Sequence, residues 1–147
     1  MKEKQNENII FLNLLYKNAA MGIIGIDIVL KKIENEKLAK LINEQKEEYE
    51  SYCEMVQKVL IKFGTKEEEI SKLKEISTKM MSEAMTMGKS DNEIAKMMMQ
   101  GNERGALEVQ EKLNLYEKEN IDKEVLELAR KLIATEEHNR EELKQFL

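Results

Sequence analysis

The chain contains no proline in 147 residues, and this absence constrains its fold more than any other feature. β-Sandwiches and barrels need turn signals about every 8 to 12 residues, and proline commonly supplies them. Strands also favour β-branched and aromatic side chains, but the chain has four tyrosines, three phenylalanines and no tryptophan. We therefore expect an all-α protein, and the length suits a single domain over residues 1–147.

The charge and cysteine content exclude several classes of function. The chain has 24 basic and 29 acidic residues, a net charge of −5, which is no footprint for nucleic acid. Cys53 is the only cysteine, which excludes an intramolecular disulfide and suits a reducing compartment. The apolar segment from Leu12 to Leu30 resembles a membrane span, but Lys17 and Asp27 interrupt it. We expect a buried helix there, in a cytoplasmic protein that binds no membrane.

Two glycines stand directly before signals for the start of a helix. Gly64 precedes the segment 65–68 and Gly88 precedes Ser90 to Glu93, and both segments read as capping boxes. Asn35 and Asp122 are further candidates for N-caps. Together these signals predict five helices, over residues of about 7–33, 36–63, 67–87, 91–116 and 123–146.

Apolar residues recur every three or four positions in these segments, as in helices with one buried face. In the first helix they are Ile9, Leu12, Tyr16, Ala19, Ile23, Ile26, Leu30 and Ile33. In the second they are Leu38, Leu41, Tyr49, Tyr52, Val56, Val59 and Phe63, with Gln45 in the same row. In the last they are Val125, Leu128, Leu132, Leu143 and Phe146, with Glu136 or Asn139 between them.

The lengths of the connections predict how the helices are joined. The first two helices and the last two are separated by loops short enough only for antiparallel hairpins. The segment 67–87 is long enough to travel the length of a bundle as a crossover, so the helices 36–63 and 91–116 would run parallel.

The first helix has a second apolar row, which needs a cover of its own. This row consists of Ile10, Leu14, Met21, Ile24 and Ile28. The crossover could cover it through Ile70, Leu73, Ile76, Met80, Met81 and Ala84. A homodimer contact could cover it equally well, and the sequence leaves both alternatives open.

The last helix carries a short motif, Glu136-Glu137-His138-Asn139, close to a Glu-Glu-x-His signature. With this motif and the order of its segments, the chain resembles the ferritin-like superfamily, in a small bacterial branch. The resemblance implies a four-helix bundle with a long crossover between its second and third helices. It also implies a di-metal site, with a glutamate on each of two helices and Glu-x-x-His on each of the others.

The implied ligands can be checked against this sequence. The apolar phase of the last helix directs Glu136 and Asn139 inward and His138 outward, so an asparagine occupies the imidazole position. The second helix offers Glu44 and Glu47 where Glu-x-x-His is expected. One alternative is therefore a divergent carboxylate site for iron or manganese, made by Glu44, Glu47, Glu103 and Glu136.

We favour another reading of the same level, in which the inward polar residues form a layer that fixes the register of the helices. Counted outward from the last loop, Glu136 lies level with Asn102. The layer would consist of Gln45, Asn102, Glu136 and Asn139, hydrogen-bonded to one another within the core. His138 would then lie on a solvated face of its helix.

Methionines and glycines raise two further alternatives. Seven of the ten methionines lie around the crossover and the start of the fourth helix: Met80, Met81, Met85, Met87, Met97, Met98 and Met99. Thioethers bind Cu(I), but methionine also fills irregular gaps in cores and adaptable surfaces. Four glycines lie inside helices, namely Gly22, Gly25, Gly101 and Gly105, where the first and fourth helices would approach closely or leave a small cavity for a ligand.

No nucleophile is paired with a base at helical spacing, and no glycine-rich phosphate loop exists. We therefore expect a non-enzymatic scaffold or interaction protein that needs no cofactor. It would form a homodimer through the first helix or through the methionine-rich crossover. A metal-binding ferritin-like protein and a methionine-based copper protein are the alternatives.

Overall fold

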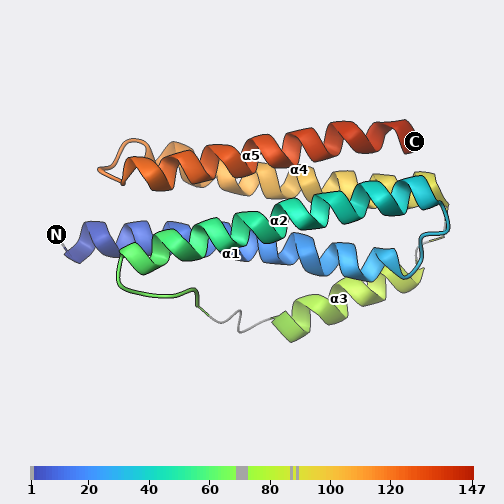
Figure 1. Ribbon diagram of the computed structural model, residues 1–147, viewed down its shortest axis with the longest axis horizontal. Helices are drawn as coiled ribbons and strands as arrows, with labels where there is room; N and C mark the ends of the chain where they lie inside the picture. Colours follow the sequence, from blue (N-terminus) through green and yellow to red (C-terminus); the bar gives the residue numbers. More distant parts are fainter. Residues whose placement is uncertain (1, 69–72, 87, 89) are drawn as a thin grey trace.

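The computed structural model describes residues 2–68, 73–86, 88 and 90–147, and within these ranges the protein is helical without any strand (Figure 1). The all-α prediction is confirmed. The helices are α1 (Lys2–Leu30), α2 (Glu36–Lys62), α3 (Leu73–Thr86), α4 (Asp91–Tyr116) and α5 (Lys123–Leu143). A short 3₁₀ turn, Lys144–Phe146, follows α5.

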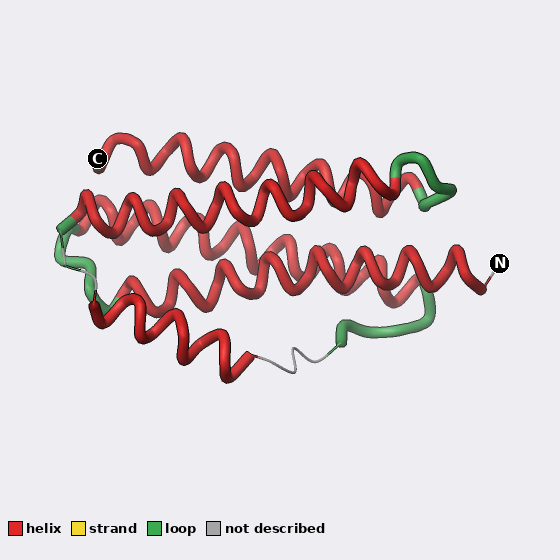
Figure 2. Tube along the Cα trace, turned by 180° about the vertical axis from the view of Figure 1, so that it is seen from behind, coloured by secondary structure: helices red, strands yellow, loops and turns green. Residues whose placement is uncertain are grey.

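The four long helices lie side by side, and α3 lies outside them against α1 (Figure 1). α1 and α2 form one antiparallel hairpin and α4 and α5 form another, as Figure 2 shows from behind. α2 and α4 run in the same direction, because α3 carries the chain back along the molecule between them. The order of the helices and the direction of each agree with the connections expected from loop length.

Three of the predicted helix starts are confirmed by their hydrogen bonds. Asn35 Oδ1 accepts from the backbone N–H groups of residues 37 and 38, at 2.8 and 3.2 Å. Ser90 Oγ accepts from Glu93 N at 3.2 Å and donates to its carboxylate at 3.0 Å. Asp122 Oδ1 accepts from Glu124 N at 2.9 Å. Each side chain satisfies donors that the first turn of a helix leaves unpaired.

The start of the crossover helix was predicted wrongly. Residues 65–68, where the crossover helix was predicted to start, are not helical, and α3 is described over Leu73–Thr86. Gly64, at φ 80°, ends α2, with its N–H bonded to Ile61 O and the next N–H bonded to Leu60 O. Beyond it, Asn13 Oδ1 of α1 accepts from Glu68 N at 2.9 Å, so a long-range bond takes the backbone donor that a capping box would have used.

The buried face of α1 is broader than the predicted row. Phe11, Leu15 and Val29 are fully buried although they lie outside that row, whereas Tyr16 and Ile23 are only half-buried. α1 is apolar on more than one side, so periodicity alone could not identify the face that meets the core. On α2 and α5 the polar positions are clear, and every predicted apolar residue is buried except the last of each helix.

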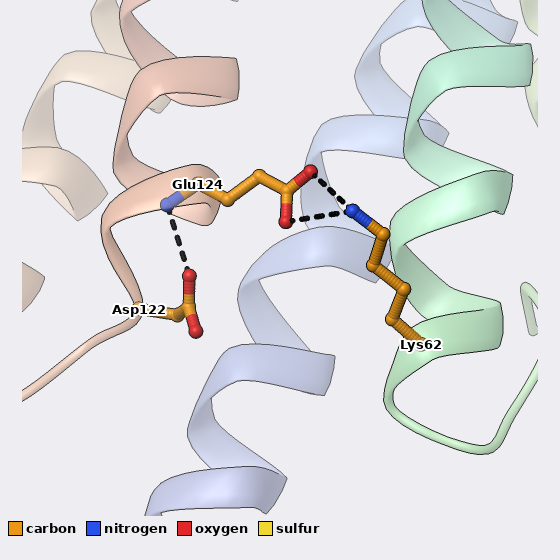
Figure 3. Close-up of polar contacts among 3 residues, drawn as sticks. All are labelled: Lys62, Asp122 and Glu124. Carbon is orange, nitrogen blue, oxygen red and sulfur yellow. Dashed lines mark hydrogen bonds and ion pairs between the residues drawn. The ribbon is translucent and has the colours of Figure 1, made fainter.

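The ends of the helices are joined at the end of the molecule that carries the α4–α5 loop. Lys62 Nζ, at the end of α2, lies 2.9 and 3.3 Å from the two carboxylate oxygens of Glu124 on α5 (Figure 3). Asp122 caps α5 by accepting from Glu124 N. Asn8 of α1 accepts from Asp122 N at 2.9 Å. These bonds connect α1 and α2 to the start of α5.

The second apolar row of α1 is covered unevenly. Ile28, near the end of the helix, is buried, and there Lys32 Nζ donates to Ala84 O of α3. Ile10, near its start, is 57% exposed. The α3 crossover thus covers part of the row. Of the expected covering residues, Ile70 lies outside the described residues, as do the side chains at positions 73 and 76.

By length and composition, residues 6–30 of α1 could span a membrane, and the described part of the chain has no second such helix. Of the 18-residue window that defines this candidate, 28% is buried within the protein. Most of the other residues of this segment are half-buried, and its exposed ones are Asn6, Ile10, Lys17 and Asp27.

Candidate functional site

The four residues of the expected polar layer are all buried inside the protein. None of them is more than 4% exposed, and they lie on α2, α4 and α5. The residues are Gln45, Asn102, Glu136 and Asn139. The last helix thus presents both Glu136 and Asn139 to the core, as its apolar phase predicted.

Two amides of the layer bind the backbone of α5. Gln45 Nε2 donates to Asn139 O at 3.3 Å. Asn102 Nδ2 donates to Glu136 O at 3.3 Å in one orientation of its amide. In the other orientation it donates to Met98 O at 2.6 Å and its oxygen accepts from Arg140 N at 3.2 Å. In both orientations α4 is bonded to the same turn of α5, so α2 and α4 are each held at a fixed level along α5.

A tyrosine one turn along α2 from Gln45 completes the contacts of the buried carboxyl. Tyr49 is buried, and its hydroxyl interacts with the side chains of Glu136 and Asn139. Burial raises the pKa of Glu136 to about 7, and the bond from Tyr49 opposes this rise. Burial, followed by the negative charge of Glu136, also raises the pKa of Tyr49. No lysine or arginine of the described chain forms an ion pair with the carboxyl.

Helix α1 reaches the layer through an asparagine that the sequence did not single out. Asn18 Nδ2 donates to Gly105 O of α4 at 3.3 Å. A Cβ at Gly105 would lie 3.1 Å from Asn18 Oδ1 and 3.4 Å from a carboxylate oxygen of Glu136. Glycine at this position therefore lets both polar side chains approach the backbone of α4. Asn18 could have been found as a polar residue at the level of Gly105, had the register of the two helices been known.

The other three interior glycines do not bring α1 and α4 together as expected. A Cβ at Gly22 would lie 3.2 Å from the ring of Tyr49, so this glycine makes room for a side chain of α2. Nothing lies within 4 Å of a Cβ at Gly25 or Gly101. The predicted close approach is thus limited to Gly105 and its contact with the side chain of Asn18.

The layer is not fully hydrogen-bonded. Gln45 Oε1 is buried without a hydrogen-bond partner among the described residues, and the amide of Asn139 has only the hydroxyl of Tyr49 nearby, outside ordinary hydrogen-bond geometry. An unpaired buried polar atom costs about 1 to 3 kcal/mol, so the layer reduces the stability of the fold. Its two amide bonds to the backbone of α5 fix the level of α2 and α4 along that helix.

The alternative carboxylate site is not assembled. Glu44, Glu47 and Glu103 are exposed, and only Glu136 points into the core. The described residues contain no group of three histidine, cysteine, aspartate or glutamate side chains placed to hold a metal ion. Glu44 and Glu47 face solvent, because Gln45 takes the inward position on this part of α2.

The residues of this level do not fit the di-metal centre that the ferritin-like resemblance implies. Such a centre requires several carboxylates and imidazoles around two cations. Here the one buried carboxyl faces a tyrosine hydroxyl and neutral amides. His138 is exposed, as expected, and its Nε2 lies 2.7 Å from Glu142 on the same helix. Asp27, one turn from the layer on α1, pairs with Lys46 at 2.7 Å.

The methionines do not form one cluster. Met98 is buried in the core, and Met97 and Met99 are packed against it, whereas Met81 and Met85 are exposed on α3. Met80 is half-buried, and Met87 lies outside the described residues. Those on α4 fill gaps in the core, as flexible side chains commonly do.

Comparison of the chain with protein-family models, curated proteins and solved structures found no match in any of the three. The role of the chain must therefore be argued from its own residues.

Proposed function

We propose that the protein is a non-enzymatic ferritin-like four-helix bundle of the cytoplasm that works as a self-associating scaffold or interaction protein. The parallel direction of α2 and α4, joined by a helical crossover, supports the ferritin-like assignment. The buried polar layer also supports it, because the resemblance implies metal ligands at this level.

The observation that carries the proposal is the exposure of α1. This helix is apolar enough to span a membrane, yet in its second apolar row Ile10 is 57% exposed and Leu14, Met21 and Ile24 are only half-buried. Exposed apolar rows of this kind mark surfaces for association. Covering the row with protein would bury area now in contact with water, and each Å² of apolar surface removed from water contributes about 25 cal/mol.

The reactive side chains support a non-enzymatic role because they lie in unsuitable surroundings. Cys53 is buried, and burial, with smaller effects of Glu50 and Glu67, raises the pKa of its thiol to about 11. A nucleophilic cysteine needs a lowered pKa and access to substrate. The imidazole of His138 lies on the exposed side of α5, facing Glu142.

Sedimentation velocity over a wide range of concentration tests the proposal. We expect the sedimentation coefficient to rise with concentration toward that of a dimer. Light scattering after gel filtration should give a mass near twice 17.2 kDa at the highest loading. A protein that stays monomeric at the highest concentration would not be a self-associating scaffold.

A further inference from the structure

One surface of α1 is amphipathic in a way that fits a second copy of the chain. Five residues spaced by three and four positions follow one another along the first half of this helix and share a face. They are Glu7, Ile10, Leu14, Lys17 and Met21, and we call them the outer stripe. Ile10 is 57% exposed, Lys17 is exposed, and the other three are half-buried.

A neighbouring helix extends the apolar part of this surface. The rings of Phe11 on α1 and Tyr116 on α4 stack, with centroids 4.8 Å apart. Because the helices are antiparallel, stepping back one residue on each turns the side chain to the same side of the pair. Ile10 and Leu115 therefore turn to the same side of the pair, and Leu115 is also exposed. The geometry extends the apolar surface from the outer stripe toward α4.

The order of charges along the outer stripe selects the occupant. An acidic residue stands at its start, and a basic residue stands ten positions later, with Ile10 and Leu14 between them. We propose that α1 of a second copy lies antiparallel on the outer stripe, related by a two-fold axis. Ile10 of each copy would then face Leu14 of the other. Lys17 of each would lie near Glu7 of the other, so one register places apolar side chains against apolar ones and opposite charges close together.

Other parts of the protein limit this contact to the first half of α1. Further along, α3 already covers the helix near Ile28, where Lys32 bonds to Ala84. A lipid surface fits the stripe less well than a helix does, because Lys17 interrupts the apolar row. Asn13, on the same half of α1, accepts from the α2–α3 connection. Apolar residues flanked by charges of opposite sign, as Glu7 and Lys17 flank Ile10 and Leu14, are the pattern of a helix–helix seam.

Charge exchange tests the register, and the inference rests on the self-association proposed above. Lys17→Glu and Glu7→Lys should each raise the dimer Kd about tenfold, because two symmetry-related pairs change from attraction to repulsion. The double variant Glu7→Lys/Lys17→Glu should return to within about twofold of the wild-type Kd, because both pairs are restored with reversed sign. Sedimentation equilibrium measures all four proteins.

Lys31→Glu is the matched control, because it makes the same charge change just beyond the end of α1 and away from the stripe. It should leave the dimer Kd unchanged, and circular dichroism should show that every variant is folded.

A double variant that dimerises more weakly than both single variants would overturn the inference, as would an equal effect of Lys31→Glu on the dimer Kd. A wild-type protein that dimerises with no response to any of these variants would overturn only the register, whereas a monomeric wild type would overturn the proposed function as well. Flotation of a monomeric protein with neutral phosphatidylcholine vesicles would assign the stripe to lipid instead.

Discussion

The buried layer and the outer stripe both depart from the usual distribution of side chains, in which apolar groups are buried and polar groups are exposed. In the layer, polar groups such as Asn139 are removed from water without full hydrogen bonding. In the stripe, Ile10 is left in water although the core lies one helix face away. Both arrangements lower the stability of the single chain. We propose that both serve specificity, the layer by fixing how the helices pair and the stripe by offering a surface to a second copy.

The largest difference should appear between two residues on opposite faces of α1. Leu12 is fully buried and Ile10 is 57% exposed. Leu12→Ala should lower the free energy of unfolding by about 3 to 4 kcal/mol, because it leaves a cavity in the core. Ile10→Ala should lower it by less than about 0.5 kcal/mol at concentrations where the protein is monomeric. Urea denaturation measures both, and similar losses would show that Ile10 belongs to the core.

The buried carboxyl should make stability depend on pH. Folding raises the pKa of Glu136 from 4.5 to about 7, so the folded chain holds this proton more tightly than the unfolded chain. The contribution of this group is therefore full below pH 4.5 and is lost as the pH rises past about 7. The loss should be about 3 kcal/mol, at about 1.4 kcal/mol per pKa unit.

Glu136→Gln tests this dependence, because the amide has nearly the same shape and no charge. The variant should be more stable than the wild type at pH 8 and should lack the slope between about pH 5 and 7. Glu137→Gln changes the exposed neighbour and should keep the wild-type slope. If thermal melting gave the same pH profile for the wild type and Glu136→Gln, Glu136 would not be buried as a carboxyl.

Two glycines of α4 offer a smaller contrast, one turn apart. At Gly105 a side chain would meet Asn18 and Glu136, whereas at Gly101 it would meet open space. Gly105→Leu should therefore destabilise the protein by about 2 kcal/mol through overpacking. Gly101→Leu should be neutral or stabilising by up to about 1 kcal/mol, because leucine favours a helix. Equal melting temperatures for the two variants would contradict the described packing of α1 on α4.

The ion pair in Figure 3 should have the smallest effect. Lys62 and Glu124 are both largely exposed, and such pairs contribute less than about 1 kcal/mol. Lys62→Met should lower the melting temperature only slightly at low salt and not at all in 1 M NaCl, because salt screens exposed charges. A loss comparable to that of Leu12→Ala would mean that the joined ends of α2 and α5 control the stability of the whole fold.

The sequence was informative where a signal is local. Asn35, Ser90 and Asp122 cap the helices they were expected to cap, because an N-cap bonds only to the following turn. The inward positions of α2 and α5 could be read because polar residues surround the apolar row. Gln45 and Asn139 were therefore found on the correct faces.

The remaining features depend on contacts between distant parts of the chain. Thr65 resembles an N-cap, yet the backbone N–H of Glu68 beyond it donates to Asn13 of α1. No local sequence pattern predicts that bond. The bond of Tyr49 to Glu136 could not be predicted, because it depends on the exact level of α2 against α5. The exposed Glu44, Glu47 and Glu103 lie on the same helices as the inward Gln45 and Asn102. Composition alone therefore could not show which of these residues face the core.

Crosslinking through an engineered cysteine tests the central claim, that the outer stripe joins two copies, most directly. Ile10 and Leu107 are similarly exposed, at 57% and 60%, and the native Cys53 is buried with a raised pKa. With a short bis-maleimide, Ile10→Cys should give a covalent dimer at concentrations where Leu107→Cys, on α4, gives little. Equal crosslinking at the two positions, or none at position 10 in a protein that sediments as a dimer, would contradict the account.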